Sequence, residues 1–316
     1  MPTPGPRVAT EVAEALADGR GVVALESTLI AQGLPWPHNL ETAHASEAVI
    51  RLAGSVPATI AIIGGLIHIG LSGAQLEEVA RSTGRFIKAS RRDLSWVVAR
   101  RLDATTTVSA TLWLARAAGI KVLATGGLGG VHREAATTFD ISTDLDELAR
   151  ADGTLVVCSG VKSILDIPAT LELLESQGVP IVGYRTDEFP AFTSRSSGLP
   201  LGARVDSPNE ANALLATHRN LKLPAAIVLA QAVPDEVALD RQVMEDALAL
   251  ALSEARDQNI RGKEVTPFLL ERIRWSTEGR SLSANKALII ANAGLAGAIA
   301  SLIIPEEPTP LQAESS

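Results

Sequence analysis

The sequence predicts an α/β protein with a largely parallel central sheet, and three observations lead to this expectation. Short apolar segments rich in valine, isoleucine and alanine alternate with longer amphipathic segments along the chain. Several longer segments end at a glycine, the residue that commonly follows a helix end, at Gly84, Gly119, Gly153 and Gly178. The 316 residues suffice for one large domain or two small ones with a substantial core.

The expected elements follow this alternation in order. Ser72 and Gln75 form a capping-box pattern that opens a helix, and Pro168 is typical of a first helical turn. The expected strands are 21–28, 58–65, 85–90, 120–127, 154–160, 179–184 and 225–234, and the expected helices are 72–84, 105–118, 143–151, 168–177, 235–257 and 284–303.

Three segments have no strand or helix period. Residues 185–207 are rich in proline, serine and glycine and form a long loop, which is either a lid or binding loop or a disordered connection. The proline-rich arm 1–7 and the acidic tail 305–316 are expected to be flexible.

Composition excludes several classes of protein. The net charge of −8 and the lack of a basic run argue against a nucleic-acid polymer as partner, but a small anionic ligand stays possible. The single cysteine, Cys158, excludes an internal disulfide framework, and the N-terminal residues lack a signal-peptide pattern, so we expect a cytoplasmic protein. The uncharged stretch 287–304 is rich in alanine and glycine, which favours a tightly packed core helix over a membrane span.

Charged residues and glycines stand where expected strands end. Glu26, Lys88 and Lys162 each close or follow an apolar strand, and residues 126–130 form a run with four glycines. Because ligands of open parallel sheets bind outside the carboxyl ends of the strands, these features predict a shared pocket. Lys162 has two interpretations: its ammonium lies at the protein surface, or it is a nucleophile in a partly desolvated site.

The segment 139–146 places Asp140 after an extended piece and Asp144 in the first turn of a helix. One interpretation is helix capping and a favourable helix dipole. The other is a hard-cation site for Mg²⁺ or Mn²⁺, held by a carboxylate and several waters. His68 and His132 receive no functional role.

Eight motifs together resemble the pseudouridine-5′-phosphate glycosidase family, also described as indigoidine synthase A-like. They extend over residues 20–295 and read ALESTLIAQGLPWP, PATIAIIGG, KASRRDL, ATTTVSATL, ATGGLGGVHR, TFDISTDL, GVKSILD and GKEVTPFLL. The resemblance implies one domain over 1–316, a three-layer α/β/α sandwich, a homotrimer, and one Mn²⁺ per subunit, with Mg²⁺ or another divalent ion as an alternative. The implied reaction is the reversible cleavage of pseudouridine 5′-phosphate with water to uracil and ribose 5-phosphate.

The resemblance also assigns roles to residues of this sequence. It places the nucleophilic lysine at Lys162, the proton donor at Glu26 and the metal carboxylate at Asp140. The implied substrate contacts are Lys88, Val108, Ser142, Thr143, Asp144 and, more weakly, Asn285. The chain is one residue longer than the family pattern near Asp152 and Gly153, between the metal and lysine motifs.

The bond to uracil is carbon–carbon, so a protonated carboxylic acid alone does not provide the route that ordinary glycosidases use. A lysine that opens the ribose and forms an imine at C1′ does provide one, with Glu26 protonating the uracil carbon. Two other readings stay open: a Schiff-base aldolase or lyase acting on another sugar phosphate, and a regulator that only binds a phosphosugar through Lys162.

Overall fold

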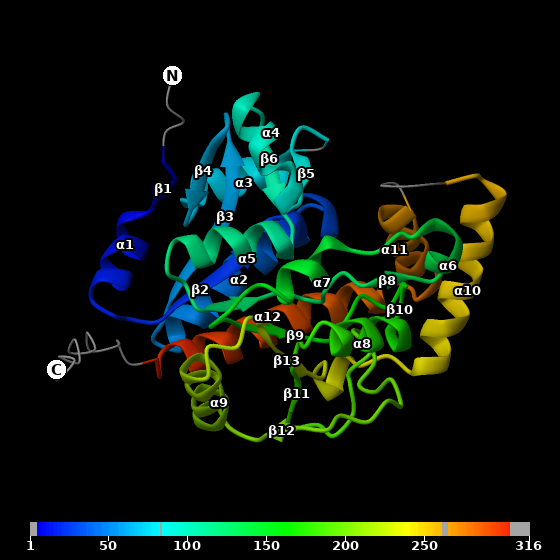
Figure 1. Cartoon of the computed structure of the whole chain (residues 1–316). Coiled ribbons are helices and arrows are strands. Elements are labelled where there is room, and N and C mark those ends of the chain that lie inside the picture. The colour runs from blue at the N-terminus through cyan, green and yellow to red at the C-terminus, as the bar shows by residue number, and fades with distance from the viewer. Residues whose placement is uncertain (1–4, 83, 261–264, 304–316) are drawn as a thin grey trace.

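The computed structural model describes residues 5–82, 84–260 and 265–303, and Figure 1 shows its arrangement. Its centre is one sheet with the strand order β1-β4-β3-β2-β7-β9-β13-β11-β12, to which β6 adds beside β3 and β5 beside β6. Within the described part of this sheet only β3 forms antiparallel pairs, with β4 and β6. The strands are β1 (Arg7–Val8), β2 (Val22–Glu26), β3 (Val56–Ile63), β4 (Leu66–Ile69), β5 (Ile87–Ala89), β6 (Ala104–Thr106), β7 (Val122–Ala124), β9 (Leu155–Cys158), β11 (Ile181–Tyr184), β12 (Arg204–Val205) and β13 (Ile227–Gln231).

The central strands are apolar on both faces, as expected for a parallel sheet covered on both sides. In β9, Val156 and Cys158 belong to one core cluster, whereas Leu155 and Val157 belong to another. Helices α5 (Val108–Ala117) and α7 (Thr143–Leu148) pack on the first cluster; α2 (His38–Leu52), α9 (Pro208–Asn220) and α12 (Arg280–Ala300) contribute to the second. The predicted α/β fold with a mostly parallel sheet between helical layers is confirmed (Figure 1).

The other elements lie around this sandwich. They are α1 (Thr10–Ala17), α3 (Gly73–Arg81), α4 (Leu94–Ala99), α6 (Ala135–Thr138), α8 (Ile167–Ser176), α10 (Arg241–Asp257), α11 (Val265–Ser276) and a small antiparallel pair of β8 (Val131–His132) with β10 (Leu165–Asp166). The predicted helix 105–118 begins too early, because residues 104–106 form β6 and Val108 is the first helical residue. The predicted helix 235–257 begins only at Arg241, where the Asp240 side chain caps it.

Helix α12 is the one described helix that is long and apolar enough to cross a membrane by length and composition, and half of its apolar window is buried in the protein. It packs on α2 so closely that a Cβ at Gly297 would lie 3.0 Å from Ala53 and Ile50. Ser55 Oγ donates a hydrogen bond of 2.7 Å to the Gly297 carbonyl in the same contact. The alanine and glycine content therefore serves a core helix, as the sequence predicts.

The segment 185–207 is an ordered wall of the sandwich. The side chains of Phe189 and Phe192 are buried, and the Phe192 amide donates a hydrogen bond of 3.0 Å to the Ser159 carbonyl beyond β9. The adjacent Ala191 forms an isolated bridge with Gly160. These contacts attach the long loop to the chain beside Lys162.

The expected flexible ends lie largely outside the described residues. Residues 1–4 and the tail 305–316 are not described, and Arg7 at the end of the expected arm pairs with His68 as part of β1. Within the motif GKEVTPFLL, residues 262–264 also lie outside the described part of the chain.

Candidate active site

Glu26 is the last residue of β2, and its carboxyl group is buried with 7% exposure. Strand β7 lies beside β2 and ends one residue before Thr125, so the Thr125 hydroxyl reaches Glu26 and donates a hydrogen bond of 2.5 Å to Oε1. Burial raises the pKa of Glu26, and the Lys162 charge and the Thr125 hydrogen bond oppose this shift. Glu26 therefore holds a proton more readily than an exposed glutamate.

Lys162 follows β9 by four residues and continues its direction along the glycine run. Its amide donates a hydrogen bond of 3.1 Å to the Leu128 carbonyl, and Val161 bridges Leu128 in parallel. The half-buried side chain extends its positive charge to the environments of Glu26 and His132. The amine and the buried carboxyl group thus lie within electrostatic reach of each other.

Lys88 is an exposed residue of β5, which pairs with β6 at the side of the sheet. Its charge lowers the pKa of Glu26 less than the Lys162 charge does, and it lowers the pKa of His132 less than the Asp140 charge raises it. Two strand-end groups that the sequence predicts to converge, Lys88 and Lys162, thus both lie within electrostatic reach of Glu26. Their catalytic roles stay predictions.

The first turn of α5 lies near the Ser142–Asp144 turn. Thr107 precedes the helix without a side-chain capping hydrogen bond, and the Asp144 carboxylate instead accepts a hydrogen bond from the Ser109 amide in the first turn. Thr143 Oγ1 lies 3.2 Å from Ser109 Oγ, while Ser142 Oγ accepts a hydrogen bond from the Asp144 amide. The expected substrate contacts of this region therefore lie at two adjoining helix starts.

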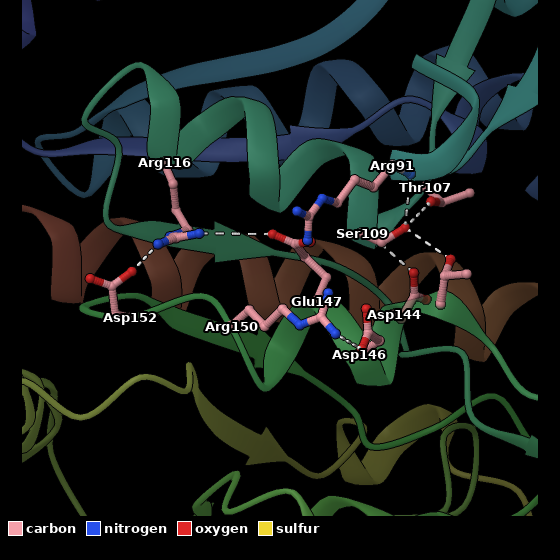
Figure 2. Close-up of polar contacts among 10 residues, drawn as sticks. Arg91, Thr107, Ser109, Arg116, Asp144, Asp146, Glu147, Arg150 and Asp152 are labelled. Atoms are coloured by element: carbon pink, nitrogen blue, oxygen red, sulfur yellow. Dashed lines mark hydrogen bonds and ion pairs between the residues drawn. The ribbon is translucent and has the colours of Figure 1, made fainter. Parts of the chain in front are cut away.

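Asp144 is engaged within the protein. The residue is 4% exposed, and its Oδ1 accepts a hydrogen bond of 2.9 Å from the Ser109 amide (Figure 2). Its Oδ2 accepts one of 2.9 Å from the Gly129 amide. It thereby joins the start of α5 to the glycine run. The expected contact between Asp144 and substrate stays a prediction, and these bonds show a positioning role beside it.

Asp140 and His132 meet at the pocket rim. The Asp140 side chain is 55% exposed, and its Oδ2 lies 3.8 Å from His132 Nδ1. Burial lowers the pKa of His132, Asp140 opposes this, and both lysines reinforce it. The described residues contain no group of three or more histidine, cysteine, aspartate or glutamate side chains that could hold a metal. A divalent ion held by one carboxylate, with water filling its other positions, fits this donor set; a fully protein-ligated ion does not.

Asn285 lies on α12. It lines a cavity of about 250 Å³ together with Gln32, Ser163 and Phe192, and Ser163 directly follows Lys162. The Asn285 Oδ1 atom is buried and has no hydrogen-bond partner, so it is available to a ligand N–H group. The structure thus places this residue beside the expected nucleophile.

The glycine run differs in conformation from the double-glycine turn at residues 64 and 65. Gly64 and Gly65 adopt positive φ angles of 58° and 76°. None of the four glycines in 126–130 has a positive φ angle. A Cβ at Gly126 would lie 2.9 Å from Ile289, and one at Gly127 would lie 2.7 Å from Phe192, so this run allows close packing.

Sequence reasoning missed two residues of the pocket. Thr125 directly follows an apolar strand, but its contact with Glu26 depends on β7 lying beside β2. No local sequence pattern predicts which strands are neighbours in the sheet. His132 receives no role from the sequence, although the charges of Asp140, Lys88 and Lys162 act on its pKa.

The sequence is similar to that of known proteins over most of its length. The sequence model described as indigoidine synthase A like protein matches residues 11–302. A pseudouridine-5′-phosphate glycosidase from Caldanaerobacter subterraneus subsp. tengcongensis is 53% identical over 290 residues, which cover 92% of this chain and 94% of that protein. One from Herpetosiphon aurantiacus is 52% identical over 93% of this chain and 96% of its own length.

Two solved structures are similar throughout. The prealnumycin C-glycosynthase in complex with ribulose 5-phosphate superimposes with a TM-score of 0.87 at 37% identity, covering 95% of this chain and 97% of that one. An indigoidine synthase A-like protein from Thermotoga maritima has a TM-score of 0.85 at 36% identity, with the same coverage.

Proposed function

This chain belongs to the indigoidine synthase A-like family, and we propose that it cleaves the carbon–carbon glycosidic bond of pseudouridine 5′-phosphate to give uracil and ribose 5-phosphate. The single observation that carries the proposal is the buried Glu26 carboxyl group within the electrostatic reach of Lys162, in a chain about half identical to glycosidases of that name. The C-glycosynthase solved with ribulose 5-phosphate supports a sugar phosphate as ligand of this fold.

Lys162 supplies the covalent group in the proposed mechanism. Its amine bonds to C1′ as the ribose ring opens, and a proton moves to the ring oxygen. The nitrogen lone pair then forms the C=N bond while the C1′–C5 electron pair leaves with uracil. The amine thus acts as the nucleophile and, as an imine, as the electron acceptor.

Glu26 delivers the proton that the departing uracil carbon needs. Burial raises its pKa, which suits a group that must carry a proton near neutral pH. Water then adds to the imine and releases ribose 5-phosphate and the Lys162 amine. The atoms balance as pseudouridine 5′-phosphate plus water giving uracil plus ribose 5-phosphate.

The phosphate end has a suitable place at the starts of α5 and α7. The Ser142 and Thr143 hydroxyls and Lys88 would provide donors and positive charge for it, with Val108 beside them at the start of α5. Asn285, with its free buried acceptor, would hold an N–H edge of uracil beside Ser163. A bound Mn²⁺ or Mg²⁺ would be held by Asp140 and would neutralise phosphate charge.

We also propose a homotrimer in the cytoplasm. Phe139 and Ile141, which flank Asp140, are 82% and 42% exposed, and such apolar side chains near a site support association. The buried Cys158 thiol, whose pKa burial raises to about 12, supports a reducing compartment. Light scattering of the purified protein should give three times the mass of one chain.

The decisive experiment incubates the protein with pseudouridine 5′-phosphate and follows uracil by chromatography. Borohydride added with ribose 5-phosphate should trap one adduct per chain at Lys162, and mass spectrometry should locate it. Adduct formation without uracil release would favour the other Schiff-base reaction, an aldolase or lyase. Absence of both would leave the phosphosugar-binding reading.

A further inference from the structure

Helix α7 carries two buried carboxylates one turn apart, Asp144 and Glu147, at positions that share a helix face. Asp144 binds backbone amides, as described above. Glu147 is only 1% exposed, so it lies too deep to touch a substrate. The proposed reaction uses no acid at this position, and the burial of its charge therefore calls for another explanation.

Glu147 binds an arginine from a distant segment. Arg91 Nη1 donates a hydrogen bond of 2.7 Å to Glu147 Oε2, and Figure 2 shows the two side chains meeting between α7 and the start of α5. The other Glu147 oxygen has no hydrogen-bond partner, and Arg116 Nη1 stands 3.9 Å from it. Arg91 thus makes the hydrogen bond that holds this carboxylate.

The segment that Arg91 belongs to is part of the candidate active site. Arg91 begins the short 3-10 turn Arg91–Asp93, three residues after Lys88 in β5. Its amide contacts Ser109 Oγ at 3.4 Å, and the amide of Thr107 donates a hydrogen bond of 3.0 Å to the Ala89 carbonyl. The segment is therefore joined to α5 by its backbone and to α7 by the Arg91 side chain.

We propose that Glu147 is a positioning residue that, by binding Arg91, fixes the Lys88–Arg91 segment against the starts of α5 and α7, where the substrate phosphate binds. This inference rests on the proposed function for the identity of the substrate. Replacing a buried ion pair by apolar residues often costs no stability, so retention of this pair is better explained by geometry than by stability. In the proposed function the segment that this pair holds serves phosphate binding, so loss of the pair affects binding and not the chemical step.

Three variants test the role: Glu147→Gln, Arg91→Gln and the double variant. Each single change should raise KM for pseudouridine 5′-phosphate about tenfold and leave kcat within about twofold, because uniform binding is lost. The double variant should raise KM no further than either single variant, because both remove the same connection. The control is Asp146→Asn on the same helix, which removes the exposed 2.8 Å ion pair with Arg150 just beyond the helix end and should change neither constant.

Arg91→Gln keeps the test valid if Glu147→Gln does not fold, since Arg91 is partly exposed. The inference is overturned if folded Glu147→Gln retains the wild-type KM, whether or not Arg91→Gln alters it, or if the two effects on KM multiply in the double variant.

Hydrogen exchange gives a readout that does not depend on the reaction. Amides of residues 88–91 should exchange faster in Glu147→Gln than in wild type or Asp146→Asn, and unchanged exchange there would overturn the inference. If wild-type protein releases no uracil, the proposed function fails, and the exchange result still decides the positioning role.

Discussion

The hydrogen bond from Thr125 to Glu26 provides a direct test of the proposed acid. Thr125→Val removes the hydroxyl but keeps the branched shape of a side chain that is almost fully buried. A hydrogen bond to a charged group contributes about 1.5–3 kcal/mol. Since about 1.4 kcal/mol corresponds to a factor of ten, proton binding by Glu26 should tighten about tenfold to a hundredfold.

The direction of the pH shift follows from the protonation state of Glu26 that the Thr125 hydrogen bond stabilises. The Thr125 hydroxyl favours ionised Glu26 and opposes the burial that raises its pKa. Without the hydroxyl, the protonated acid persists to higher pH. If Glu26 protonates uracil, kcat of the variant should decline at a pH about one to two units above the wild-type decline.

The assay is uracil release measured from pH 5 to pH 10 at saturating substrate. Thr125→Ser retains the donor and should keep the wild-type basic limb, which separates the hydroxyl from packing effects. A folded Thr125→Val protein whose basic limb coincides with that of wild type would refute Glu26 as the acid seen in kcat.

The remaining predictions concern the nucleophile, the metal and the core. Lys162→Ala should fold and bind substrate but form no borohydride adduct and release no uracil; substantial turnover by this folded variant would move the covalent role elsewhere. A chelator should abolish wild-type activity, and added Mn²⁺ should restore it. The Asp140→Ala variant should lose most activity and should not respond to Mn²⁺. If its activity rises with Mn²⁺ as in wild type, the ion binds away from Asp140. Asn292→Ala should lower the free energy of unfolding by about 2–4 kcal/mol in urea titrations. The reason is that the buried Asn292 amide donates hydrogen bonds to the Thr125 carbonyl at 2.9 Å and to Ser159 Oγ at 3.1 Å. A loss under about 1 kcal/mol would show that the Thr125 and Ser159 groups find other partners.

Local sequence signals predicted the parallel strands and the groups at their ends, because a buried parallel strand reads as an apolar run wherever it lies in the sheet. They failed for β6, where the threonines of residues 105–107 were assigned to a helix although their branched side chains favour a strand. They also failed for α2, whose buried face includes Asn39, Thr42 and Glu47 and so lacks a clear apolar stripe.

Within the site, the electrostatic neighbours of Glu26 were predictable in kind but its partner Thr125 was not. The engagement of Asp144 was equally hidden, since its partners at Ser109 and Gly129 come from other segments. Such contacts arise from the order of strands and helices in space. An aspartate at a helix start gives the same sequence pattern whether its carboxylate faces a ligand or a neighbouring backbone amide.

The glycine run 126–130 has a consequence for how this enzyme can change. Each of its four glycines abuts a different neighbour: Ile289 of α12, Phe192 of the long loop, Ser142 before α7 and Thr170 of α8. A new side chain at any one position would displace a different neighbour, so no single compensating change could accommodate them all. A saturation library selected for activity should therefore retain glycine at all four positions. A larger residue at one of them should be accepted only when its own neighbour is replaced by a smaller residue.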